Sequence, residues 1–151
     1  MAEGRVVSIY VSSGTGDPMR PLTDVRAVAG KGLDGDRYFG SEVGTQLTLI
    51  EAEAIEAVEE KVGLKLELGD ARRNVVTRGI VLNDLLDHEF EVGDVRLRGV
   101  RLSEPCQHLA SLTDERILRG LVHKGGLKCE ILNDGLIRVG DLISAGVPVS
   151  S

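Results

Sequence analysis

The sequence is poor in aromatic residues, cysteine and proline, and it has no tryptophan. Its aromatic residues are Tyr10, Tyr38, Phe39 and Phe90, which are too few for a platform on which nucleic-acid bases stack. Acidic residues outnumber basic ones, and the formal net charge is −6. Because affinity for phosphate backbones requires a dominant positive field, we expect no nucleic-acid partner.

The two cysteines, Cys106 and Cys129, are too few for the disulfide scaffold of a small secreted protein. The sequence also shows no secretory leader and no apolar run long enough to span a bilayer. We therefore expect a cytoplasmic protein with reduced thiols and no membrane partner. A length of 151 residues predicts a single domain over residues 1–151.

Glycine is abundant: there are 19 glycines, scattered between short apolar runs, a pattern typical of β folds with tight turns. Apolar and β-branched runs predict strands over residues 6–11, 25–28, 46–50, 127–131 and 136–139. Alternation over 90–102, with a turn at Gly93-Asp94, predicts two more. The sequence Asn133-Asp134-Gly135 predicts a hairpin between the strands that flank it.

The clearest predicted helix covers residues 51–62, where Ile55, Val58 and Val62 recur at helical spacing and Gly63 provides a stop. Shorter helical segments are predicted at 81–86 and 112–122. Residues 12–21 and 30–40 are rich in glycine and polar residues and are predicted to be loops. Seven or eight strands with few helices predict a mainly β fold, a small mixed β-barrel.

Cys106 is the strongest candidate for a reactive residue. It follows the predicted strand and Pro105, at a strand end, where functional residues often lie. His108 favours a thiolate, the reactive form of cysteine, whereas the charge of Glu104 opposes it. A buried and inert cysteine is the alternative that the residues leave open.

Cys129 lies between Lys128 and Glu130 in a predicted strand, so we expect its side chain to point into the core. Both cysteines and two histidines also suggest an alternative zinc site, although their spacing matches no common zinc pattern. The four residues of that site are Cys106, His108, His123 and Cys129.

The densest positive stretch of this acidic chain is Arg72-Arg73-Asn74, with Arg78 nearby. Guanidinium groups recognise oxyanions through paired hydrogen bonds. Arg119, His123 and Lys124 supply a second positive cluster beside Gly125-Gly126. Two such clusters indicate a pocket for a small anion, and the alternative is a solvated charged loop.

The segment from Gly32 to Arg37 lacks the pattern of a nucleotide phosphate loop. We expect its glycines to set a turn that positions Asp36 and Arg37. The sequence also has no nucleophile elbow, so it gives no support for a Ser-His-Asp triad.

Seven short motifs follow one another along residues 4–145 in an order that one family shares. They are GLDGDR (32–37), QLTLIEA (46–52), RNVVTRG (73–79), FEVGD (90–94), EPC (104–106), GG (125–126) and IRVGD (137–141). The chain therefore resembles a MOSC domain, which is found at the C-terminus of molybdenum cofactor sulfurases and as stand-alone bacterial proteins.

The resemblance implies a barrel-like β fold with few helices and a role with the molybdenum cofactor, molybdopterin. Cys106 matches the family's cysteine, which is proposed to carry sulfur or to meet the molybdenum centre. We therefore expect Cys106 to be a catalytic residue or a metal ligand. The resemblance also places Arg73, Asn74 and Arg78 near the phosphate or pterin of the cofactor, with Arg119 or Lys124 assisting.

The chain departs from the cofactor sulfurases in one respect. Those proteins carry a pyridoxal-phosphate-dependent cysteine desulfurase domain ahead of the MOSC domain, and no pyridoxal phosphate site is identifiable here. We therefore expect a separate cysteine desulfurase to load Cys106, and a molybdoenzyme or cofactor-synthesis protein to be a further partner. We also expect no counterpart of the extra N-terminal barrel of the larger amidoxime-reducing relatives.

The leading hypothesis is a cofactor-handling protein in which Cys106 accepts sulfur as a persulfide or ligates the metal during transfer. A second is a small oxidoreductase that keeps the cofactor and reduces N-hydroxylated compounds. A third is a non-catalytic carrier that acts only with a partner, and a fourth is a relative that has lost the ligand. The sequence does not determine the oligomeric state.

Overall fold

The computed structural model describes residues 2–145, and within them the chain is mainly β with a few short helices. The strands are β1 (Ala2–Val11), β2 (Arg20–Leu22), β3 (Asp24–Val28), β4 (Gly32–Leu33), β5 (Leu47–Glu51), β6 (Val75–Arg78), β7 (Glu89–Val92), β8 (Val95–Leu102), β9 (Leu127–Ile131), β10 (Gly135–Arg138) and β11 (Leu142–Ala145). The helices are α1 (Ala52–Val62), the 3-10 helix η1 (Leu82–Leu85), α2 (Gln107–Leu112) and α3 (Ile117–Gly120).

Eight strands form one sheet in the order β11-β7-β8-β9-β5-β6-β1-β2, and β1 also pairs with β11. This last pairing closes seven of the strands into a barrel, and β2 pairs with the far end of β1. The neighbours β5 and β6 run parallel, whereas the other pairs are antiparallel. The predicted small mixed β-barrel is therefore confirmed.

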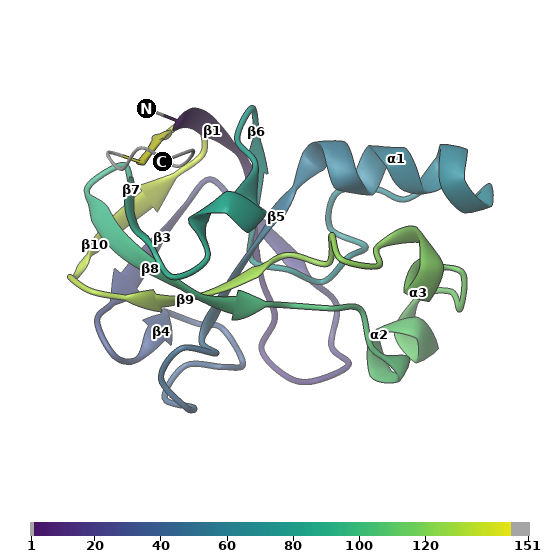
Figure 1. Ribbon diagram of the computed structural model, residues 1–151. Helices are drawn as coiled ribbons and strands as arrows, with labels where there is room; N and C mark the ends of the chain where they lie inside the picture. The colour runs from purple at the N-terminus through teal and green to yellow at the C-terminus, as the bar shows by residue number, and fades with distance from the viewer. Residues whose placement is uncertain (1, 146–151) are drawn as a thin grey trace.

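The three α-helices lie together on one side of the barrel (Figure 1). The predicted helix over 51–62 is present as α1, and Gly63 ends it in the left-handed conformation, with φ of 72°. None of the helices within residues 2–145 combines the length and the apolar character needed to cross a bilayer.

Two apolar clusters hold the fold together, one inside the barrel and one between the barrel wall and the helices. Strands β5 and β6 separate them: Leu49 and Val75 face the barrel interior, while Ile50 and Val76 face the helices. A strand that is covered on both faces is mostly apolar, which explains Leu47, Leu49 and Ile50 in β5, where Thr48 is buried as well. Each fully buried side chain of this kind contributes about 1.5–3 kcal/mol.

The pairing of β1 with β6 shifts by one residue between Val6 and Ser8. Val7 is the extra residue of this β-bulge. Because of it, Val6 and Ile9 both contribute to the barrel core, although strict alternation would place them on opposite faces.

The hairpin predicted at Asn133-Asp134-Gly135 is wrong. In the described part of the chain, β9 pairs with β5 and β8, whereas β10 pairs with β3 in a separate three-stranded sheet. Asn133 accepts a hydrogen bond from the Arg96 N–H at 2.6 Å, and Asp134 accepts one from the Ala29 N–H at 2.8 Å. Because of these tertiary contacts, the segment connects β9 in one sheet to β10 in the other and does not form a hairpin.

The helix predicted over 112–122 is also wrong in its extent. Helix α2 ends at Leu112, and α3 begins at Ile117. Between them, Asp114 accepts hydrogen bonds from both the side chain and the backbone N–H of Arg116, which lower the pKa of Asp114 to about 2. Such a local side-chain bond competes with a continuous helix and starts a new turn.

Candidate functional site

Cys106 is exposed and lies in the connection between β8 and α2, directly before Gln107. The alternative of a buried Cys106 is therefore excluded. The thiol opens into a small pocket of about 60 Å³, to which four separate segments of the chain contribute. Its lining residues are Thr15, Gly16, Arg37, Tyr38, Arg72, Arg73, Cys106, His108, Leu109 and Leu112.

Arg73 fixes the position of the segment that leads to Cys106. Its Nε donates to the carbonyl oxygen of Gly125 at 2.7 Å, and its Nη2 donates to those of Ser103 and Glu104 at 3.2 and 3.4 Å. The guanidinium group is largely buried, and this burial lowers the pKa of Arg73, while the nearby Cys106 opposes the shift. Arg73 therefore places a positive charge in the same pocket as the Cys106 thiol.

Gly125 allows this arrangement because it has no side chain. A Cβ atom at this position would collide with the carbonyl oxygen of Ser103 and approach Cδ of Pro105 to 2.9 Å. The backbone preceding β9 can therefore lie against the Ser103–Pro105 stretch, where Arg73 binds both. The Gly125-Gly126 pair and the cysteine thus belong to the same site.

Arg37 and Asp36 form a buried ion pair under the other wall of the pocket. Arg37 Nη1 lies 3.3 Å from Asp36 Oδ1, and the two side chains are 8% and 0% exposed. Asp36 also accepts hydrogen bonds from the backbone N–H groups of Ser12 and Tyr38. Arg37 Cζ lies 4.5 Å from the centroid of the Tyr38 ring. As predicted, the glycine-rich turn positions Asp36 and Arg37.

Arg72 adds a third guanidinium group to the pocket. Its backbone has a positive φ of 57°, an uncommon conformation for a residue with a side chain, and its carbonyl oxygen accepts a hydrogen bond from Arg37. Arg72 Nη2 donates to the carbonyl oxygen of Asp17 at 2.8 Å. Burial and the charge of Arg37 lower the pKa of Arg72.

The structure places the other predicted binding residues elsewhere. Asn74 is buried and joins strands, because its amide bonds the carbonyl oxygen of Tyr10 and the N–H of Thr48. Lys124 Nζ lies 3.7 Å from a carboxylate oxygen of Glu51, and Arg119 is exposed on α3. Of the five predicted cofactor-binding residues, the described structure thus brings Arg73 alone into the pocket of Cys106.

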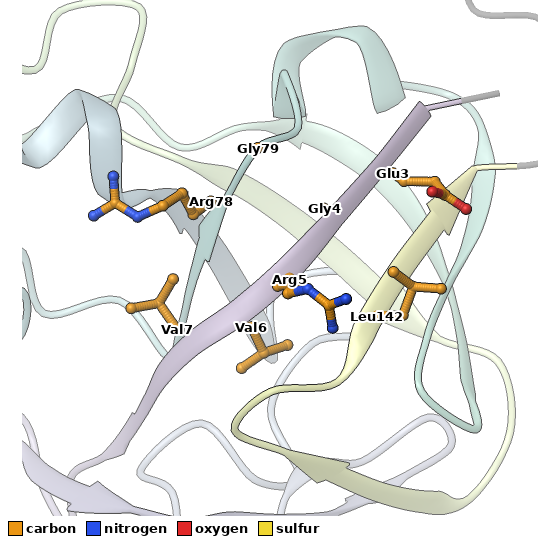
Figure 2. Close-up of a pocket in the computed structure, with 8 residues that line it drawn as sticks. All are labelled: Glu3, Gly4, Arg5, Val6, Val7, Arg78, Gly79 and Leu142. Atoms are coloured by element: carbon orange, nitrogen blue, oxygen red, sulfur yellow. The ribbon is translucent and has the colours of Figure 1, made fainter.

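Arg78 lines a different hollow, of about 450 Å³, between β1, β6 and β11 (Figure 2). Figure 2 shows its side chain on the opposite side of β1 from the side chain of Arg5. Its guanidinium group forms a two-point ion pair with the Glu56 carboxylate of α1, with N···O distances of 3.1 and 2.6 Å. This contact raises the pKa of Arg78 and joins β6 to α1.

The zinc alternative finds no support in residues 2–145, where no group of three or more metal-ligating side chains lies together. Cys129 is fully buried in the barrel core, as predicted, and burial raises the pKa of its thiol. His123 Nδ1 lies 3.1 Å from Oε2 of Glu104, whose other oxygen accepts the His123 backbone N–H. His108 is exposed and lines the thiol pocket.

Arg37 and Tyr38 line the pocket but were not predicted as site residues, and Arg72 was predicted only as part of the cationic stretch. The order of residues along the chain does not show which side chains of the cationic stretch line the thiol pocket. Arg37 and Tyr38 lie about 70 positions before Cys106, and only the closure of the barrel brings them to it.

Lys128 and Arg101 lie directly opposite each other on β9 and β8, which is an unfavourable like-charge pair. Burial, together with the charges of Arg101 and Arg73, lowers the pKa of Lys128, and Cys106 opposes this shift. We therefore expect Lys128→Glu to raise the free energy of unfolding by up to about 1 kcal/mol. Urea unfolding checks this value.

The neighbouring pair on the same strands provides the control. Glu130 lies opposite Arg98, so Glu130→Lys creates a like-charge pair where a favourable one exists and should lower stability by a similar amount. If Lys128→Glu and Glu130→Lys change the free energy of unfolding by the same amount and in the same direction, the cross-strand charges do not determine the stability change.

Comparison with known proteins agrees with this architecture. The structure is similar to that of the YuaD protein from Bacillus subtilis, with a TM-score of 0.83 and 16% identity, covering 93% of this chain and 94% of that one. For YiiM from Geobacillus stearothermophilus, the TM-score is 0.77 and the identity is 19%, and the match covers 98% of this chain and 79% of that one. For YiiM from Escherichia coli, the TM-score is 0.69 and the identity is 16%, and the match covers 97% of this chain and 72% of that one. At these identities, the likeness establishes the fold.

A search of curated proteins finds no match to the chain. The model of the MOSC domain family matches residues 34–144, which include the Asp36–Arg37 turn, Arg73, Cys106 and the Gly125-Gly126 pair. This match spans most of the chain and agrees with the closed mixed barrel. The chain therefore belongs to the MOSC domain family, which is linked to molybdenum cofactor sulfurase-type domains.

Proposed function

We propose that this protein handles the molybdenum cofactor and carries sulfur on Cys106. One observation carries the proposal: the exposed thiol shares a small pocket with the buried guanidinium group of Arg73. A thiolate is both the nucleophile in sulfur exchange and a ligand of thiophilic metals. The guanidinium group of Arg73 supplies a positive charge in the same pocket.

Loading of Cys106 would proceed by exchange with a persulfide on a donor protein. The Cys106 thiolate attacks the terminal sulfur of the donor persulfide, and the S–S bond of the donor breaks as a new S–S bond forms on Cys106. The donor leaves as a thiolate, so the sulfur atom moves without net oxidation or reduction. Exposure of Cys106 makes this direct attack feasible.

The pocket fits the anionic end of the cofactor better than its ring system. A volume of about 60 Å³ is roughly the share of two liquid water molecules, so it admits a terminal group only. A guanidinium group has five N–H donors, and the contacts of the described residues use one of those on Arg72 and three on Arg73. When bound, the molybdenum centre would supply a thiophilic metal beside Cys106.

Anaerobic titration with the molybdenum cofactor tests the proposal, with wild type compared with Cys106→Ser and Arg73→Ala. Saturable binding that Arg73→Ala weakens supports a cofactor pocket. If Cys106→Ser still binds but no longer passes on sulfur, Cys106 is a carrier. No binding by the wild-type protein would refute the cofactor-handling role.

One outcome of the same titration would favour the alternative function. If Cys106→Ser loses the metal while the wild-type protein retains both metal and pterin, Cys106 is a permanent ligand. The protein would then be a small oxidoreductase, and reduction of N-hydroxylated compounds is the reaction to assay.

The contribution of Arg73 can be measured without the cofactor. We expect Arg73→Gln to slow the alkylation of Cys106 by iodoacetamide at neutral pH by about five- to tenfold, because the substitution removes the positive charge that lies in the same pocket as the thiol. Arg73→Lys retains the charge but not the planar set of donors, so it should keep most of the rate.

Urea unfolding of both variants separates this effect from a loss of structure, since both lose hydrogen bonds to the carbonyl groups of Ser103, Glu104 and Gly125. If Arg73→Gln and Arg73→Lys slow alkylation equally, the charge of Arg73 does not act on Cys106, and its role is limited to positioning.

A further inference from the structure

Four of the nine large apolar side chains that are exposed in the described chain lie on two segments next to the thiol pocket. They are Tyr38, Phe39, Val43 and Val100. Tyr38 lines the pocket itself, and the loop that follows it packs against β8, where Cγ1 of Val100 lies 3.4 Å from the position of a Cβ atom on Gly44. Exposed apolar side chains that gather in one area, rather than singly, are typical of an interaction site.

A β-bulge in β8 adds a positive charge to the edge of this apolar area. The pairing of β8 with β9 shifts between Gly99 and Arg101, so Val100 is the extra residue. Strict alternation would turn Arg101 toward the barrel interior. Instead, Val100 and Arg101 are both exposed while Gly99 is buried, and the bulge places the two side chains together on the outer surface.

Lys128 brings a second positive charge to the same edge. It lies directly opposite Arg101, and the charges of Arg73 and Cys106 both act on its pKa, so it belongs to the surroundings of the thiol. Within the described chain, neither Arg101 nor Lys128 forms an ion pair. In a protein of net charge −6, this edge is a local positive area that attracts carboxylates.

The pair of like charges identifies the kind of partner that fits this area. Arg101 and Lys128 repel each other across the strands, and carboxylates from a partner would remove this repulsion. A second copy of the chain, related by a two-fold axis, would bring the same two cations to the same interface. The charges therefore favour an acidic partner protein over self-association.

We propose that this area is the docking face for the protein that delivers sulfur to Cys106, and that this donor presents apolar side chains and carboxylates next to its persulfide. The docking face consists of Tyr38, Phe39, Val43, Val100, Arg101 and Lys128. The inference rests on the proposed function and adds the surface that recognises the donor. The thiol pocket, of about 60 Å³, holds a terminal group only, so the contacts that select a protein donor lie around it. On docking, the terminal sulfur of the donor passes to the Cys106 thiolate, and the donor cysteine leaves as a thiolate.

Sulfur transfer from a loaded cysteine desulfurase tests the docking face, with the rate measured by mass spectrometry of the intact protein at increasing donor concentration. Arg101→Glu and Lys128→Glu should each raise the donor concentration for half-maximal rate about three- to tenfold, because they place a negative charge against the carboxylates of the donor. Val43→Ser should raise it about three- to fivefold through lost apolar contact. Lys128→Glu is expected to be more stable than the wild-type protein, so its weaker docking would not arise from unfolding.

Alkylation by iodoacetamide separates docking from the reactivity of the thiol. This small uncharged reagent needs no docking face, so Val43→Ser should be alkylated at the wild-type rate. Arg101→Glu and Lys128→Glu should lose less of the alkylation rate than of the transfer rate at low donor concentration.

Two matched substitutions outside the docking face serve as controls. Arg5→Glu reverses a charge at the hollow between β1, β6 and β11 (Figure 2), and Val139→Ser removes an exposed valine that follows β10. Both variants should keep the wild-type donor concentration for half-maximal transfer.

The inference is overturned if Arg101→Glu, Lys128→Glu and Val43→Ser take sulfur from the desulfurase as the wild-type protein does. It is also overturned if sedimentation shows a dimer that Val43→Ser dissociates, because a second copy then covers the face. A wild-type protein that takes sulfur from glutathione persulfide but not from the desulfurase would refute the docking face and leave the sulfur-carrier role standing. A wild-type protein that takes sulfur from neither would refute the proposed function, and the docking face with it.

Discussion

Replacing Cys106 by serine should abolish the transfer of sulfur from a persulfide donor to this protein. Cys106 is the exposed thiol of the described chain, whereas Cys129 lies in the barrel core with its side chain fully buried. A hydroxyl group cannot form the S–S bond that holds the sulfur atom. Mass spectrometry of the intact protein, after incubation with a loaded cysteine desulfurase, measures the gain of one sulfur atom.

Cys129 supplies the matched control for this experiment. Cys129→Ala should accept sulfur as the wild-type protein does, because burial keeps the Cys129 thiol protonated and inaccessible. Cys129→Ser should also accept sulfur but unfold more readily by about 1–3 kcal/mol, because it buries a hydroxyl group in an apolar core. If Cys106→Ser gains sulfur and Cys129→Ala does not, Cys129 carries the sulfur and the role proposed for Cys106 is refuted.

Replacing Asp36 by alanine should destabilise the protein by about 3–5 kcal/mol. The substitution leaves the nearly buried guanidinium group of Arg37 without its carboxylate, which is 3.3 Å away in the folded protein. It also removes the acceptor for the backbone N–H groups of Ser12 and Tyr38. The backbone at Ser12 and the Arg37–Tyr38 wall of the thiol pocket would lose their common anchor.

Urea unfolding measures this effect, and Asp34 in the same turn serves as the control. Asp34 is exposed, so Asp34→Ala should change the free energy of unfolding by no more than about 0.5 kcal/mol. We also expect Asp36→Ala to alter alkylation of Cys106, since Arg37 and Tyr38 line its pocket. A variant as stable as wild type would show that the Asp36–Arg37 pair contributes no net stability.

The order and type of most elements could be predicted because their signals are local. The apolar runs that became β1, β5 and β9 and the helical periodicity of α1 are properties of consecutive residues. The hairpin signal at Asn133-Asp134-Gly135 is equally local, yet it failed. Asn133 and Asp134 bond to Arg96 and Ala29, so tertiary hydrogen bonds decide the path of the chain there.

The sequence by itself determined the β-rich class of this protein, the family motifs and the placement of Cys129 in the core, which left Cys106 as the candidate for a reactive thiol. Strand alternation and position after a strand end carry that information along the chain. Only the tertiary structure decided which cations accompany the thiol. Arg37, Arg72 and Arg73 meet Cys106, while Arg78 pairs with Glu56, because closure of the barrel brings distant segments together and places neighbours in sequence on opposite faces.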